Sequence, residues 1–188
     1  MDYLKHGWAV VQPNLVGWVL FGIVVTVVNM FGIGFVLWPN VYRATRKAVA
    51  SNAAPEMGDL FSFDNIADDA IVMILFGVAL TLSVFLCGIG QFVALPLFFF
   101  APWLVADGSF DAMGAMKASM AHGKVNLVGH LIQIMIMGFV MGLLSTVTFG
   151  LGGLIGTPVL LVAYEKYFRD NRDGLLAAAQ AAQIPMKG

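Results

Sequence analysis

Charge is scarce in this sequence. Of its 188 residues, 11% are Asp, Glu, Lys or Arg, whereas 60% are hydrophobic. Typical soluble domains carry roughly 25% charged residues. A chain with so little polar surface cannot coat a water-facing globule, so composition indicates an integral membrane protein. The net charge of −1 also excludes a general basic field for binding nucleic acid.

Residues with distinctive chemistry are equally few. One cysteine, Cys87, excludes an internal disulfide and a cysteine-based zinc cluster. The nucleophile elbow, the Walker phosphate loop and the HExxH zinc motif are absent from the sequence. We therefore expect a protein that is not an enzyme and that has no catalytic residue, metal site or cofactor.

The charges that are present leave three long windows free of Asp, Glu, Lys and Arg. These windows are residues 6–42, 70–106 and 125–164. A membrane-spanning helix needs about 20 apolar residues, so each window has room for two short spans. No small-residue cleavage site follows the apolar run that begins at Leu15, and we expect this run to be a retained membrane segment.

A glycine signature lies inside each window, in the stretches "FGIGFVLWP" (31–39), "CGIGQFVALP" (87–96) and "FGLGGLIGTP" (149–158). Glycine suits a chain reversal because it tolerates positive φ. Each window is therefore predicted to be a helical hairpin, with legs at about 15–31 and 35–50, 70–87 and 90–106, and 126–147 and 152–168. The predicted turn residues are Gly32, Gly34, Gly88, Gly90, Gly150 and Gly152.

The predicted fold is all-α, with six transmembrane helices in three repeated hairpins and short interfacial helices between them. "NLVGW" (14–18) and "NLVGH" (126–130) open the first and third copies, which supports a repeat. We expect one membrane domain over residues 1–188, with repeats at about 14–50, 70–106 and 126–168. The tail, 169–188, is expected to be cytoplasmic, and its part 173–188 is expected to form a short helix and a frayed end.

Each second leg contains a proline, which removes a backbone donor and kinks a helix. In lipid, the freed backbone groups need partners from neighbouring helices or from cavity water. One interpretation is a kinked span that packs inward. The alternative is a helix that starts at the proline after a short re-entrant stretch.

If every hairpin returns to its starting side, all charged segments share one side of the membrane. That side then holds every Lys and Arg, while the three turns hold no charge. The positive-inside rule places such a side in the cytoplasm, together with both termini.

The segments "APWLVADGSFDAMGAMKASMAHGKVNLVG" (101–129) and "GLGGLIGTPVLLVAYEKYF" (150–168) combine apolar legs with an acidic-glycine step, a Gly-Lys-x-Asn step and an Ala-Tyr ending. In these features the chain resembles uncharacterised prokaryotic glycine-rich integral membrane families of repeated hydrophobic hairpins. The membrane domain of some glycerophosphoryl diester phosphodiesterases is a relative of those families. The resemblance implies a membrane fold in a prokaryotic cytoplasmic (inner) membrane. It implies no catalytic residue, since the phosphodiesterase chemistry lies in a separate domain.

The first return leg carries cations unusually close to its glycines. Arg43, Arg46 and Lys47 follow Gly34 within about 20 Å along a helix. A deep charge is a candidate for a cavity or an ion pair, and a shallow one extends to lipid headgroups. Acidic residues of the next linker, including Asp59, are expected to pair with these cations or to be solvated.

Two further features concern helix ends. "DGSFD" (107–111) is predicted to form a turn, with Ser109 capping the following helix. His130, near the start of the fifth predicted span, is interpreted as an interfacial residue, with a proton relay as the alternative.

The third predicted hairpin contains small residues at a spacing that suits close helix packing. Gly138 and Gly142 form one GxxxG motif, and Gly152 and Gly156 form another. Such spacing lets helices approach closely. We expect packing within the protomer, with self-association as the alternative.

For function, three classes stay open. The first is a non-enzymatic scaffold or accessory subunit that binds lipids, other membrane proteins or itself. The second is a channel or transporter, since repeats and broken helices are typical of transporters. The third is a membrane enzyme that acts on lipids.

Overall fold

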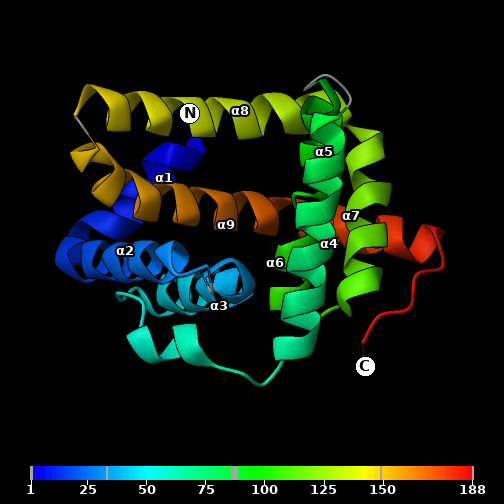
Figure 1. Cartoon of the computed structure of the whole chain (residues 1–188), viewed down its shortest axis with the longest axis horizontal. Coiled ribbons are helices and arrows are strands. Elements are labelled where there is room, and N and C mark those ends of the chain that lie inside the picture. Colours follow the sequence, from blue (N-terminus) through cyan, green and yellow to red (C-terminus); the bar gives the residue numbers. More distant parts are fainter. Residues whose placement is uncertain (1, 33, 86–88, 149, 188) are drawn as a thin grey trace. The chain divides into compact units, whose positions relative to one another are not determined.

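The computed structural model describes residues 2–32, 34–85, 89–148 and 150–187. Within these residues the chain forms helices and no strand, which confirms the predicted all-α class. The elements, shown in Figure 1, are α1 (Asp2–Val11), the 3-10 helix η1 (Gln12–Asn14), α2 (Leu15–Met30), α3 (Gly34–Ser51), the 3-10 helix η2 (Met57–Phe61), α4 (Ile66–Val84), α5 (Ile89–Phe98), α6 (Ala101–Ala106), α7 (Ala112–Val125), α8 (Leu127–Val147) and α9 (Leu151–Ala181).

Three helical stretches are long and apolar enough to cross a membrane. They are Asp2–Met30, Ile66–Val84 and Leu127–Val147, with 29, 19 and 21 residues. A span needs about 20 residues, so the second and third fit a bilayer and the first exceeds that length. Each overlaps the first leg of a predicted hairpin, although the first stretch begins at Asp2 rather than near residue 15. These helices indicate that the protein associates with a membrane, as its composition predicts.

The second legs are helical but are less suited to spanning, for reasons that differ between copies. The helix α3 carries Arg43, Arg46 and Lys47 in its second half. The second copy is interrupted, since α5 ends at Phe98 and α6 begins at Ala101. The helix α9 is long but acquires charge from Glu165 onward. Six spans and a threefold hairpin repeat therefore stay predictions.

The glycine signatures lie where helices change direction or begin. Gly32 and Gly150 have φ values of +75° and +90°, a region that favours glycine because it has no Cβ. Gly34 is the first residue of α3, and Gly90 and Gly152 lie in the first turns of α5 and α9. Gly88 lies outside the described residues.

The prolines lie inside the return helices rather than at their starts. Pro39, Pro96 and Pro158 fall within α3, α5 and α9. The described helices thus begin beside the glycine signatures and continue through the prolines. Only the second copy, where Pro102 follows Pro96, is broken between its two prolines.

The chain divides into two compact units. The first comprises residues 1–62 and 135–167, and the second comprises residues 63–134 and 168–188. The helices α8 and α9 each contribute residues to both units. The single membrane domain expected over residues 1–188 stays a prediction.

The core of the first unit forms where α2 packs on α3. Phe21 and Val25 are four residues apart and share one face of α2, while Val41 and Ala44 present the matching face of α3. Leu60 of η2 and Leu161 of α9 complete this buried cluster. The 3-10 turn η2 is thereby held under α3.

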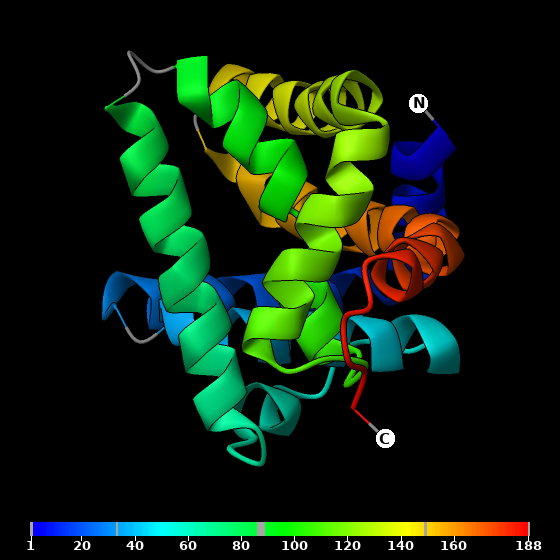
Figure 2. The same ribbon diagram turned by 90° about the vertical axis from the view of Figure 1, so that its right-hand side faces the viewer.

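In the second unit, α4, α5 and α7 pack along one another (Figures 1 and 2). The approach of α7 to α5 depends on Gly123, because a Cβ there would lie 2.8 Å from the carbonyl oxygen of Pro96. Ser119 of α7 bonds to the break between α5 and α6. Its hydroxyl donates to the carbonyl of Leu97 over 2.8 Å and accepts from the N–H of Phe100 over 3.2 Å. A neighbouring helix thus satisfies the backbone that the interrupted helix leaves free.

The C-terminal segment departs from its prediction. The helix α9 runs without a break to Ala181, so the tail does not form a separate helix. After α9 the described residues 184–187 form no regular helix, and the backbone N–H of Lys187 donates to the carbonyl of Ser109 over 3.0 Å. This contact lies within the second unit, and the expected frayed end stays a prediction.

Candidate functional site

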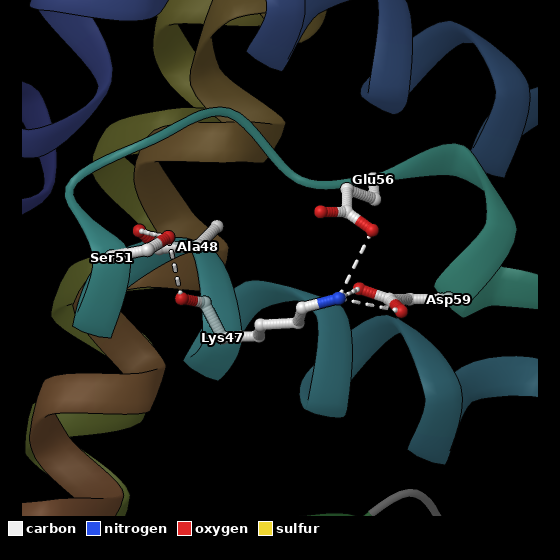
Figure 3. Close-up of polar contacts among 5 residues, drawn as sticks. All are labelled: Lys47, Ala48, Ser51, Glu56 and Asp59. Carbon is white, nitrogen blue, oxygen red and sulfur yellow. Dashed lines mark hydrogen bonds and ion pairs between the residues drawn. The ribbon is translucent and has the colours of Figure 1, made fainter.

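The helix α3 carries the cations that the sequence predicts as site residues, Arg43, Arg46 and Lys47. Lys47 binds two carboxylates (Figure 3). Its ammonium nitrogen lies 3.0 Å from Glu56 Oε2 and 3.2 Å from Asp59. The predicted pairing of a linker acid with this cluster is confirmed for Asp59. The two hydrogen bonds raise the pKa of Lys47 above its ordinary value. Lys47 and Glu56 are exposed, so this ion pair contributes little stability by itself.

Arg43 contacts a buried amide. Its Nη1 donates to Asn40 Oδ1 over 2.5 Å. Asn40 is fully buried, and its Nδ2 donates to the carbonyls of Leu60 over 3.1 Å and Ser62 over 2.7 Å. Asn40 therefore joins α3, η2 and the arginine through one side chain. Arg46, one turn further on, is half-buried.

Sequence reasoning missed Asn40. The available signal was an amide directly after Pro39 inside a charge-free window, a position where a polar group requires partners. The partners are Leu60 of η2 and Ser62 just after it, 20 and 22 positions along the chain, and no local pattern reveals them. A headgroup or cavity role stays a prediction for Arg43 and Arg46. Lys47 is already neutralised by two carboxylates, which weakens its case as a lipid-binding cation.

The glycine motifs of the third hairpin border a small cavity within the first unit. Its volume is about 200 Å³, and its lining includes Gly138, Gly142 and Gly156. A Cβ on Gly156 would lie 3.2 Å from Met141 Sδ, whereas a Cβ on Gly142 would meet nothing within 4 Å. Gly138 and Gly142 of α8 therefore face Gly156 of α9 across this cavity, and the two helices do not pack closely enough to fill it. Gly152 packs locally, and its N–H donates to Thr148 Oγ1 over 2.6 Å.

An aromatic cluster in the second unit encloses two histidines. The rings of His122 and His130 have centroids 4.9 Å apart, and Phe100 lies edge-on to each at 5.7 and 5.4 Å. His122 Nε2 lies 3.4 Å from Asn171 Oδ1. His130 is 3% exposed, so it packs against protein rather than presenting its ring outward. Sequence reasoning considered His130 but missed His122, which stands eight residues before it.

This cluster does not assemble a metal site. Among the described residues, no group of three or more His, Cys, Asp or Glu side chains is placed to hold a metal ion. The histidine pair therefore lacks the further ligands that a structural zinc site uses. Its visible role is packing, with Trp103 and Phe168 stacked at 5.7 Å beside Phe100.

Charged residues of the second unit join three separate segments. Arg172 of α9 pairs with Asp107 at 2.9 Å, and Ser109 Oγ donates to the same carboxylate. Lys187 pairs with Asp68 of α4. The expected cap on α7 is wrong, since Asp111 rather than Ser109 accepts from the N–H of Gly114 over 2.6 Å. Ser109 is instead committed to Asp107.

Comparison of the chain with protein-family models, curated proteins and solved structures finds no match. The described residues combine apolar helices, long enough to span a membrane, with polar side chains that bind one another between segments distant in the sequence.

Proposed function

We propose that this chain is a non-enzymatic, multi-pass protein of a prokaryotic cytoplasmic membrane and that it acts as a scaffold or accessory subunit. The observation that carries this proposal is the apolar outer surface of its long helices. On α8, Val128, Phe139 and Val147 are 64%, 71% and 68% exposed. Exposed apolar surface of this extent favours contact with lipid or with another membrane protein.

The polar contacts support a structural role. Asn40 ties the linker to α3, Ser119 satisfies the break before α6, and Arg172 ties α9 to Asp107. Each contact joins segments that are distant in the sequence. A scaffold requires such fixed geometry, because its surface must be presented to a partner in one arrangement.

The proposed topology has six membrane legs, with both termini and both long linkers in the cytoplasm. Two ion pairs support its one-sided charge distribution. Arg172 binds Asp107, and Lys187 binds Asp68, so three charged segments meet within one unit. The hydrocarbon core of a bilayer is about 30 Å thick, and residues in hydrogen-bond contact cannot lie on its opposite sides.

The experiment is purification of the epitope-tagged full chain from its native membrane in mild detergent. We expect a membrane protein, or further copies of this chain, to copurify in a fixed ratio. Val128→Trp, at an exposed position of α8, is expected to reduce that ratio. Purified chain that turns over phospholipid in the absence of any partner contradicts the proposal.

A channel or transporter is the second candidate, and the interrupted α5–α6 leg favours it. Broken helices are typical of transporter binding sites. Flux of ions or small solutes into liposomes containing the purified chain distinguishes the two candidates. Selective flux that is lost in Arg43→Leu replaces the scaffold proposal, whereas liposomes without flux support it.

A further inference from the structure

An open groove runs between α4 and α5 in the second unit. Its volume is about 570 Å³. Clefts that hold small ligands enclose about 300–1,000 Å³, so the groove is large enough for a molecular occupant. It is lined by Ala79, Leu82, Ser83, Gly90, Val93, Ala94, Leu97 and Phe98.

The lining selects an apolar occupant. Among the described lining residues none is charged, and the polar side chain there, Ser83, is already bonded. The Ser83 hydroxyl donates to the carbonyl of Leu80 over 2.6 Å, as serine commonly does within an apolar helix. A ligand with hydrogen-bonding groups would therefore lose its water without gaining a side-chain partner in this groove.

The groove continues the outward apolar surface of a candidate membrane span. Val78 and Leu82 of α4 are 49% and 61% exposed, and Phe92 and Val93 of α5 are 49% and 43% exposed. The lining residues of α4 lie in its C-terminal half, away from Asp68 and Asp69 in its first turn. In a bilayer, this part of α4 is surrounded by hydrocarbon.

Leaving this groove unfilled inside a bilayer costs free energy. Lipid tails are as apolar as leucine, so no hydrophobic gain closes the two helices over the space. A void leaves its lining without the dispersion contacts that close packing supplies. Water is a poor filler, because the lining offers it no free polar side chain.

We propose that the groove binds one acyl chain of a membrane phospholipid. A helix from a second copy of this chain fits less well. The α5 lining runs from Gly90 to Phe98, about 12 Å along a helix. A helix is about 10 Å wide with side chains, so a segment of that length occupies roughly 900 Å³. This volume exceeds the 570 Å³ of the groove. An acyl chain is narrower and flexible, and it follows a groove of irregular shape. This inference rests on the proposed insertion of α4 into a membrane.

The test uses the full chain in phosphatidylcholine nanodiscs that contain a phosphatidylcholine with a photoreactive diazirine on its acyl chain. After irradiation, the labelled residues are mapped by mass spectrometry. We expect labelling of Leu82 and Val93 to exceed that of Phe139 on α8 by about threefold, the modest preference expected where lipid and protein are equally apolar.

Two variants make the test specific. Val93→Trp fills the groove and is expected to lower labelling at Leu82 to the level of Phe139. Ile71→Trp is the matched control, since Ile71 of α4 is similarly exposed at 48% but lies about three turns from Leu82 and outside the lining, and labelling is expected to stay unchanged. Leu82→Trp fills the groove from α4 and, with labelling read at Val93, serves if Val93→Trp fails to fold.

Four results overturn the inference. Equal labelling of Leu82, Val93 and Phe139 shows that lipid contacts are not selective, and labelling that persists at Leu82 in Val93→Trp shows that they lie elsewhere. In a separate Cys87→Ser, Val93→Cys variant, disulfide crosslinking between two copies shows that a protein helix fills the groove. Failure of the chain to enter nanodiscs overturns the proposed membrane function as well, and so differs from the other outcomes.

Discussion

Arg172 and Asp107, 65 positions apart, meet through two hydrogen bonds to one oxygen atom. Arg172 Nε and Nη2 lie 3.1 and 2.9 Å from Asp107 Oδ2. Asp107 marks the end of the second charge-free window, and Arg172 lies beyond the third. This pair connects two segments that the predicted topology places on the same side of the membrane.

Replacing Arg172 tests the strength of that connection. We expect Arg172→Gln to lower the free energy of unfolding in detergent by about 1 kcal/mol, a value reduced for solvent screening because the side chain is 40% exposed. Lys117→Gln removes one positive charge from an exposed position of α7 and is expected to change stability little. An equal loss in both variants means that net charge, not the pair, is responsible.

Asn40 is expected to be far more sensitive than a surface asparagine. Asn40→Ala leaves the carbonyls of Leu60 and Ser62 without their donor in a buried site, at a cost of about 2–3 kcal/mol in the free energy of unfolding. Asn14 also donates to a backbone carbonyl, that of Asn52 over 3.3 Å, but at an exposed position. Chemical denaturation of Asn14→Ala should therefore show a change below about 0.5 kcal/mol.

Two glycines in helices are expected to respond to alanine in opposite directions. In Gly123→Ala the new Cβ would meet backbone atoms of α5 at 2.8 and 2.9 Å, and we expect destabilisation of about 1–3 kcal/mol. At Gly142 a Cβ meets open space, so the better helix propensity of alanine should stabilise the protein by up to about 1 kcal/mol. Thermal unfolding of both variants in the same detergent checks this contrast. Destabilisation by Gly142→Ala would indicate that this face packs against a second helix.

The Lys47 pair gives a prediction about pH. A lysine whose pKa is raised by folding contributes stability below its unfolded pKa of about 10.4 and loses it as pH rises through the folded pKa. The difference in unfolding midpoint between wild type and Lys47→Gln should therefore be constant from about pH 6 to about pH 9, and it should be lost as the pH rises above the ordinary lysine pKa and through the raised folded pKa. At about 1 M salt the difference should shrink, since the pair is exposed. A difference that changes near neutral pH would point to another titrating group.

Sequence periodicity and charge placement predicted the helical class and the first leg of each hairpin. The reason is that a long apolar run such as Leu127–Val147 has few alternatives in a membrane. The second legs were harder, because cations in α3 and two prolines around α5 and α6 weaken the same signal. The positive φ at Gly32 and Gly150 agrees with the reversals expected there.

The polar contacts could not be read from the sequence, because they join distant positions. Nothing near Asn40 indicates that Ser62 will supply its acceptor, and nothing near His122 indicates that Asn171 will approach it. The partner of Ser109 could not be predicted from the sequence either, although it lies only two residues away. Ser109 stands where a cap is favourable, but Asp107 competes for its hydroxyl and Asp111 takes the cap.

The most direct test of the membrane account is the sidedness of single cysteines in sealed membrane vesicles. In a Cys87→Ser background, cysteine is placed at Glu56, Lys117 or Lys187 in the charged segments, and at Phe31 or Phe85 beside the turns. A membrane-impermeant maleimide is then added from one side. The account predicts that the first three positions react from the cytoplasmic side only, and the last two from the opposite side only. Reaction of Glu56 and Lys187 from opposite sides, or of Phe85 from the cytoplasmic side, would contradict it.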